Sequence, residues 1–305
     1  MTKIRLLFVI SVLMLLVGLM GMRPVSVRSA AFVVNSNNDT PDWLPGDGLC
    51  TDSWGDCTLR AAIEEANATS GIDIITFNAP MTITLSADEG PLPVITETLT
   101  IDASNRWNST KPGVVIDGNG MDENGLYLAA DDCEIYGLYI RGFGPSAIRV
   151  TSANNQIGGT GVGQRNVLSG NASYGLWLDG VSAQYNQVQN NYMGTAPDGV
   201  TAQPNQMGVG ISEGASYNTI GGSTTAEGNL ISGNSMHGVY ISGMVNDGNG
   251  LGGNTIGLDV GGTLPLPNSV DGVNVEGATD TYIGGGSALA ANLIGENGRH
   301  GVFLG

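Results

Sequence analysis

The sequence is short of basic, sulfur-containing and large aromatic side chains, and each shortage narrows the possible functions. Its 305 residues include 5 Phe, 4 Trp, 2 His and 3 Cys, and only 11 Lys and Arg stand against 28 Asp and Glu. A net charge of −17 repels phosphate groups, so neither nucleic acid nor an anionic membrane is an expected partner. The acidic balance favours solubility and attracts cations.

Glycine, in contrast, is abundant. The 48 glycines are roughly twice the average usage of about 7%. No Gly-X-Y period is present, which excludes collagen, and the alternation of apolar residues argues against disorder. A solenoid explains this composition, because each coil spends residues on turns and fills a narrow interior with Val, Ile and Leu.

An internal repeat organises the second half of the chain. Three markers recur at intervals of 63 residues, and they are Ile157, Ile220 and Ile283; Asn166, Asn229 and Asn292; and Gly175, Gly238 and Gly301. The Gly-apolar-x-apolar signature also occurs between these copies, at 208–211 and 272–275, so each period contains two coils. A fixed period of this kind indicates stacked repeats.

The repeats predict an all-β fold, the parallel β-helix. Short apolar pieces bounded by Gly, Asn, Ser and Asp are typical of strands. Inward-facing pairs are expected to stack from coil to coil, and they are Val209 and Ile211, Val239 and Ile241, and Val273 and Val275. Asn171, Asn234 and Asn297 end equivalent turns and predict a hydrogen-bonded ladder. Earlier strands are expected at 72–77, 81–85, 99–102, 114–117, 125–128, 134–140 and 147–150.

The N-terminal segment, residues 1–31, has the order of a secretory signal peptide. Lys3 and Arg5 precede an apolar run from 6 to 22, and small residues at 29–31 place cleavage after Ala31. An uncleaved anchor is the alternative, because the run approaches the length that spans a bilayer. Either reading places the remainder outside the cytoplasm.

The cysteines fit export. Cys50 and Cys57 are expected to form a local disulfide, with a metal site as the weaker alternative, and Cys133 is expected to be a buried or half-buried thiol. Directly after Cys57, residues 58–67 predict an amphipathic helix whose apolar face contains Leu59, Ala62, Ile63 and Ala66. We expect this helix to cover the open first coil of the solenoid.

The stretch Gly-Asp-Cys-Thr-Leu-Arg-Ala-Ala-Ile-Glu-Glu-Ala-Asn at 55–67 resembles the CSLREA domain of exported bacterial proteins. Thr58 and Ala61 depart from the family motif, at positions off the apolar face. The resemblance implies export and a right-handed parallel β-helix, and it is silent on activity. No Pro- or Ser-rich linker divides the chain, so one β-helix domain is expected to span residues 32–305, with a cap region at 32–77 and double coils from about 155. The chain is expected to continue beyond Gly305, because no capping helix follows the last coil.

Candidate catalytic residues are few. Asp131 and Asp132, together with Arg141, are the candidates for a polysaccharide lyase or glycoside hydrolase, and the two aspartates also offer oxygen ligands for Ca²⁺. The competing interpretation is a solvated turn, which Asp favours. His237 and His300 each precede a repeat glycine and are interpreted as a structural repeat feature. The Arg-Ile-Lys motif of polygalacturonases is missing, and Lys111 is the single lysine after the signal segment.

An aromatic row is the most distinctive predicted surface feature. Trp177, Tyr240 and Phe303 occupy equivalent repeat positions between inward apolar neighbours and are expected to point outward. Tyr127 and Tyr139 are expected to be exposed on the same strand face. The row predicts stacking on sugar rings, or alternatively packing under an insertion loop.

From these patterns the sequence predicts a secreted or cell-surface β-helix scaffold that adheres to a polysaccharide or a surface glycan. No cofactor is expected apart from the Ca²⁺ already mentioned. The alternative is a carbohydrate-active enzyme acting on an acidic polysaccharide.

Overall fold

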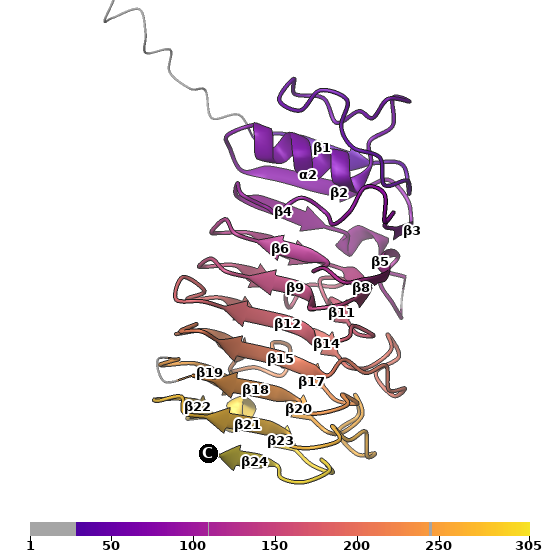
Figure 1. Cartoon of the computed structure of the whole chain (residues 1–305). Helices are drawn as coiled ribbons and strands as arrows, with labels where there is room; N and C mark the ends of the chain where they lie inside the picture. Colours follow the sequence, from indigo (N-terminus) through magenta and orange to yellow (C-terminus); the bar gives the residue numbers. More distant parts are fainter. Residues whose placement is uncertain (1–28, 109, 244–245) are drawn as a thin grey trace, which may run out of the picture.

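The chain winds into a column of coils in the computed structural model, which describes residues 29–305 apart from 109, 244 and 245 (Figure 1). Each complete coil contributes one short strand to each of three parallel sheets, which we call sheets A, B and C and which contain nine, eight and seven strands in the part of the chain that the structure describes. The fold is therefore a parallel β-helix, as the repeats predicted.

The strands have the following bounds. Sheet A contains β1 (Ala31–Val34), β2 (Asp73–Phe77), β4 (Leu99–Asp102), β7 (Glu134–Tyr136), β10 (Gln156–Ile157), β13 (Gln187–Val188), β16 (Thr219–Gly221), β19 (Gly250–Gly252) and β22 (Tyr282–Ile283). Sheet B contains β3 (Met81–Thr84), β5 (Val114–Met121), β8 (Leu138–Phe143), β11 (Val167–Leu168), β14 (Tyr192–Met193), β17 (Leu230–Ile231), β20 (Thr255–Ile256) and β23 (Leu293–Ile294). Sheet C contains β6 (Leu126–Leu128), β9 (Ser146–Val150), β12 (Tyr174–Asp179), β15 (Met207–Ser212), β18 (Val239–Ser242), β21 (Val273–Glu276) and β24 (Val302–Leu304). The helical segments are α2 (Leu59–Ala68) and the short 3₁₀ turns η1 (Ser104–Arg106) and η2 (Ala288–Ala290).

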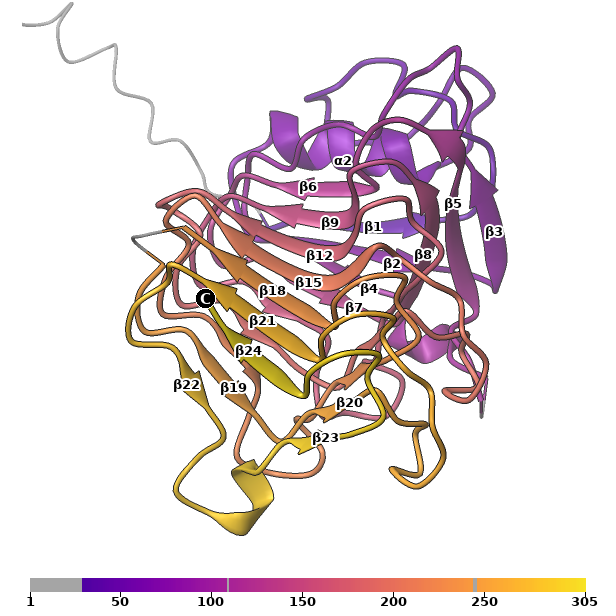
Figure 2. The same cartoon turned by 60° about the horizontal axis from the view of Figure 1, so that its bottom comes forward.

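The coils wind with a right hand. In Figure 2, which brings the C-terminal end forward, each coil runs leftward along sheet C and then turns down into sheet A as the chain approaches the viewer. This is the hand that nearly all parallel crossover connections adopt.

The interior is dry and stacked in register. Val209 pairs with Val239 and then with Val273, and all three side chains are fully buried. The neighbouring column, Ile211, Ile241 and Val275, is buried in the same way. The predicted apolar columns are thus confirmed.

In the described coils, asparagines that are buried except for Asn292 and Asn297 hold the turns together in three ladders rather than the single one predicted. They are Asn155, Asn186, Asn218 and Asn249; Asn166, Asn191, Asn229, Asn254 and Asn292; and Asn171, Asn205, Asn234, Asn268 and Asn297. In each ladder an amide oxygen accepts from both the backbone N–H and the side-chain amide of the asparagine one coil earlier. The ladders satisfy backbone groups at corners where the sheets cannot.

The predicted helix is confirmed as α2, and it lies over the first coil (Figure 1). Thr58 caps its N-terminus by accepting from the Ala61 backbone N–H at 3.0 Å. The predicted apolar face is buried, but Arg60 and Glu65, expected off that face, are buried as well. The loop before the helix packs over its other side, where Arg60 pairs with Asp39 at 3.0 Å and Glu65 accepts from two glycine N–H groups.

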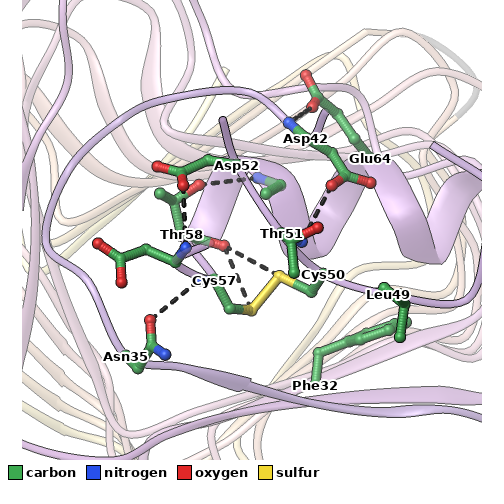
Figure 3. Close-up of a disulfide and its surroundings, with 12 residues drawn as sticks. Phe32, Asn35, Asp42, Leu49, Cys50, Thr51, Asp52, Cys57, Thr58 and Glu64 are labelled. Atoms are coloured by element: carbon green, nitrogen blue, oxygen red, sulfur yellow. Dashed lines mark hydrogen bonds between the residues drawn. A yellow bond between two sulfur atoms is a disulfide. The ribbon is translucent and has the colours of Figure 1, made fainter. Parts of the chain in front are cut away.

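The cysteine bridge lies in this cap. Cys50 and Cys57 form the predicted disulfide beside the start of the helix (Figure 3). The Cys57 backbone N–H donates to Asn35 Oδ1 at 2.9 Å, which attaches the bridge to the chain after β1. Cys133 is a free, fully buried thiol, as expected.

Two details differ from the predicted strands. The expected strand 134–140 is broken into β7 and β8 by Gly137, which has a φ of +73° and lies so close to the Ser104 backbone that a side chain would not fit. The predicted signal peptide lies almost entirely outside the described residues and stays a prediction, while its last residue, Ala31, opens β1.

Candidate functional site

The outer face of sheet C carries a column of aromatic rings. Strand register aligns one outward position on every rung, and in order it contains Tyr127, Arg149, Trp177, Gly210, Tyr240, Asn274 and Phe303. We call Tyr127, Trp177, Tyr240 and Phe303 the aromatic column. Its rings occupy every second rung, so they are spaced about 9.5 Å apart, twice the distance between neighbouring strands.

Hydrogen bonds and charges fix these rings. The Arg149 guanidinium lies between Tyr127 and Trp177, 4.9 and 4.7 Å from their ring centroids, and pairs with Asp179. The Trp177 indole donates to Ser212 at 2.8 Å, and the Tyr240 hydroxyl donates to Glu276 at 3.1 Å. The rings are therefore preorganised for contact with a ligand.

A second ring lies beside three members of the column. Tyr174 stacks on Trp177, His237 on Tyr240 and His300 on Phe303, with centroid distances of 5.2, 5.6 and 5.5 Å. These second rings come from the residue before the repeat glycine. A Cβ at Gly210, on the rung between two such pairs, would clash with the Tyr174 ring, so this ring covers that glycine.

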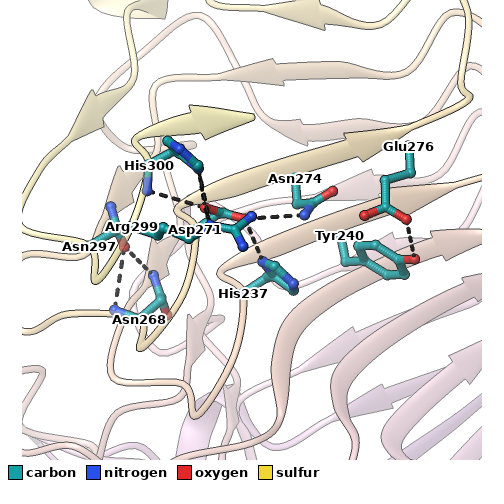
Figure 4. Close-up of polar contacts among 9 residues, drawn as sticks. All are labelled: His237, Tyr240, Asn268, Asp271, Asn274, Glu276, Asn297, Arg299 and His300. Carbon is teal, nitrogen blue, oxygen red and sulfur yellow. Dashed lines mark hydrogen bonds and ion pairs between the residues drawn. The ribbon is translucent and has the colours of Figure 1, made fainter. Parts of the chain in front are cut away.

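Asp271 joins the last two pairs. Its carboxylate is fully buried and contacts His300 Nδ1 at 2.8 Å, Arg299 Nη2 at 3.1 Å and His237 Nδ1 at 3.3 Å (Figure 4). Asn274 Nδ2 donates to the same carboxylate at 3.1 Å. The cluster draws on three successive rungs of the column.

The pKa values in this cluster follow from burial and charge. Burial alone would raise the pKa of Asp271, but hydrogen bonds from His300 and Asn274 and the charge of Arg299 outweigh burial and lower it. Burial lowers the pKa of His237, against the opposing attraction of Asp271. Near neutral pH, His237 is therefore an uncharged imidazole held beside a carboxylate.

The column lies on an open face. Trp177, Tyr240 and Phe303 are all partly exposed, and no segment is drawn across sheet C in Figure 1. These three residues therefore point outward as predicted. The alternative interpretation, packing under an insertion loop, is not what the described residues show.

The prediction that Tyr139 is exposed on the same face is wrong, because Tyr139 lies on sheet B and is only 8% exposed. There it packs with Val167, Tyr192 and Leu230.

The structure does not bring the candidate catalytic residues together. Asp131 and Asp132 are exposed in the turn between β6 and β7, where Asp132 has a φ of +58° and Asp131 accepts from the Ala153 backbone N–H. Arg141 lies on β8 in sheet B and pairs with Asp117 at 2.8 Å. This geometry matches the solvated-turn interpretation of the two aspartates. Among the residues described, no group of three or more His, Cys, Asp and Glu is placed to hold a metal ion.

Sequence reasoning missed Asp271, although a signal was available. His237, Asp271 and His300 each directly precede a repeat glycine, on successive coils. The 63-residue period relates the two histidines directly to each other and skips the intermediate coil, which carries Asp271. Comparison at single-coil spacing would have placed the three residues side by side.

Comparisons with known proteins do not identify a family. No family model matches the chain, and no curated protein matches it. Among solved structures it is similar to the crystal structure of pectate lyase Pel9A, with a TM-score of 0.42 and 14% sequence identity, over 92% of this chain and 78% of that one. A likeness this distant does not indicate a shared activity. No helix among the described residues is long and apolar enough to cross a membrane.

Proposed function

We propose that the protein is an exported, cell-surface β-helix scaffold that binds a linear polysaccharide along the outer face of sheet C. The observation that carries the proposal is the aromatic column. Its four rings recur at every second rung, along the direction in which an extended polymer would lie.

The spacing suits a chain of sugars. A separation of about 9.5 Å is comparable to the length of two sugar residues in an extended polysaccharide, so successive rings would meet every second sugar. Partly exposed aromatic rings stack on the apolar faces of sugars, and each additional contact along a repeating ligand strengthens binding through effective concentration. Ser212 and Glu276 flank the rings with groups that can hydrogen-bond to hydroxyls.

Export is supported by two features. The order of charged, apolar and small residues in 1–31 is that of a signal peptide. The Cys50–Cys57 disulfide belongs to oxidising compartments. Membership of the CSLREA class is supported by the motif stretch, in which Thr58 caps α2 as the family's serine would.

A second candidate, a carbohydrate-active enzyme, is favoured by one observation. His237 Nδ1 lies 3.3 Å from the buried Asp271 carboxylate on the same side of the β-helix as the rings, and an imidazole beside a carboxylate suits general-base chemistry. Release of reducing ends or unsaturated products from acidic polysaccharides, abolished in His237→Ala, would favour this candidate over a passive scaffold.

Binding to a panel of soluble polysaccharides tests the proposal. Trp177→Ala with Tyr240→Ala is expected to weaken binding by at least about tenfold, because two stacking contacts are lost. The control is Tyr185→Ala with Tyr217→Ala, which removes an exposed stacked pair from the corner between sheets C and A. If the unchanged protein and the two double variants bind every polysaccharide with equal affinity, the column is excluded as the binding surface.

A further inference from the structure

Sheet C carries a second regular row of side chains beside the aromatic column. Two residues after the column position, three successive rungs each bear one polar side chain that is at least partly exposed, and these are Ser212, Ser242 and Glu276. Strand register aligns the three from rung to rung, and we call them the polar row. Because residues two apart in a strand lie on the same face, a ligand on the column also meets the polar row.

The two rows repeat at different intervals. Rings of the column recur on every second rung, about 9.5 Å apart, whereas polar groups recur on every rung, about 4.8 Å apart. The shorter interval is comparable to the length of one sugar in an extended chain. Each sugar would therefore meet one polar group, and every second sugar would also meet a ring.

This double interval matches a polysaccharide with two-fold screw symmetry. In such a ribbon each sugar is rotated by half a turn relative to the one before, so the same face returns to a flat surface at every second sugar. A three-fold chain returns the same face at every third sugar, and its contacts would not coincide with rings two rungs apart. A coiled α-linked chain would curve away from the column, which follows unbroken strand register from β6 to β24.

Each cation beside the column faces a carboxylate. Arg149 pairs with Asp179 at 2.5 Å. Arg299 and His300 both contact Asp271, at 3.1 and 2.8 Å. Among the residues that the structure describes, this face therefore offers an acidic ligand no unpaired positive charge.

The uncompensated charges on this face are negative. Glu276 is exposed and has no ion-pair partner among the described residues, and its Oε2 accepts from the Tyr240 hydroxyl. Glu213, next to Ser212 in the sequence, is a second exposed carboxylate without such a partner there. A polysaccharide that carries carboxylates or sulfates would be repelled.

We propose that the aromatic column binds a neutral, β-1,4-linked polysaccharide that extends as a flat two-fold ribbon, a glucan or mannan of this linkage. The rings would stack on every second sugar, and the polar row would hydrogen-bond to hydroxyls along one edge of the ribbon. The inference rests on the proposed function, because it names the class of ligand for the same surface.

Calorimetry with three hexasaccharides tests the linkage and the charge separately. Cellohexaose is the neutral β-1,4-linked ribbon, maltohexaose contains the same sugar in α-1,4 linkage, and a β-1,4-linked glucuronate hexamer keeps the linkage but adds carboxylates. Cellohexaose is expected to bind at least about tenfold more tightly than either of the others. Maltohexaose or the glucuronate hexamer binding as tightly as cellohexaose would overturn the inference.

Variants assign the preference to the two rows. Trp177→Ala with Tyr240→Ala should lose the preference for cellohexaose, and a preference that survives there would place the ribbon elsewhere and overturn the inference. Ser242→Ala, which removes one hydroxyl from the polar row, should weaken cellohexaose binding by about fivefold. The matched control is Thr219→Ala, which removes an exposed hydroxyl from sheet A and should leave the affinity unchanged. Equal affinities of these two single variants would refute the role of the polar row.

Failure of this inference is distinguishable from failure of the proposed function. If another polysaccharide binds through the column and cellohexaose does not, the inference is overturned and the proposed function stands. If no polysaccharide binds the unchanged protein, both are overturned.

Discussion

Replacing one asparagine in the middle of a ladder should destabilise the whole column of coils. Asn229 is 2% exposed, and its side chain makes four hydrogen bonds to three residues on neighbouring coils. Its Oδ1 accepts from the backbone N–H and the side chain of Asn191, and its Nδ2 donates to Val188 and Asn254. In Asn229→Ala all four are lost, and at about 1 kcal/mol each the free energy of unfolding falls by about 4 kcal/mol.

The end of the same ladder provides a matched control. Asn292 makes three side-chain hydrogen bonds but is only half-buried, so water can replace them. We expect Asn292→Ala to cost about 1 kcal/mol. Urea unfolding followed by far-ultraviolet circular dichroism measures both variants. Equal losses in the two variants, or a loss below about 1 kcal/mol for Asn229→Ala, would refute the role given to the ladders.

Three further predictions concern single residues. Burial, reinforced by the neighbouring Glu65 carboxylate, raises the pKa of Asp42 from 3.8 to about 6. The protonated form of Asp42 therefore stabilises the fold fully below pH 4, and this stabilisation is lost as the pH rises through 6. The free energy of unfolding should fall by about 3 kcal/mol over this range. Urea titrations should show this decline between about pH 4 and 7 in the unchanged protein but not in Asp42→Asn. Burial raises the pKa of Cys133 to about 11, so iodoacetamide at pH 8 should label it only after unfolding; labelling of the native protein at the unfolded rate would contradict its burial. Gly210→Val should displace the Tyr174 ring and weaken polysaccharide binding with little change in the circular dichroism spectrum, and unaltered affinity would argue against a role for the paired ring.

Repetition made the fold predictable from the sequence. The markers at 63-residue spacing, together with the Gly-apolar-x-apolar signature at 208–211 and 272–275, identify successive coils after residue 155, because stacked coils repeat the same turns and therefore the same glycines. The helix at 58–67 was predictable from its apolar face alone. The burial of Arg60 and Glu65 was not, since it depends on a loop without periodicity that folds over the helix and supplies Asp39 and two glycine N–H groups as partners.

The candidate site was only half predictable. Alternation along a strand placed Trp177, Tyr240 and Phe303 on the outer face. Their relation to Arg149 and Asp271 required the register between coils, which alternation within one strand does not contain. Tyr139 shows the same dependence, because its burial comes from neighbours on other coils, Val167 and Tyr192 among them.

The affinity of oligosaccharides of increasing length tests the binding surface most directly. If the aromatic column binds an extended polysaccharide, affinity should rise with each added disaccharide, because each reaches one more ring two rungs further along sheet C. The steps should end when all four rings are covered. Binding along the column would be contradicted if a single disaccharide already binds with maximal affinity. It would also be contradicted if the Trp177→Ala, Tyr240→Ala double variant shows the same increase in affinity with length as the unchanged protein.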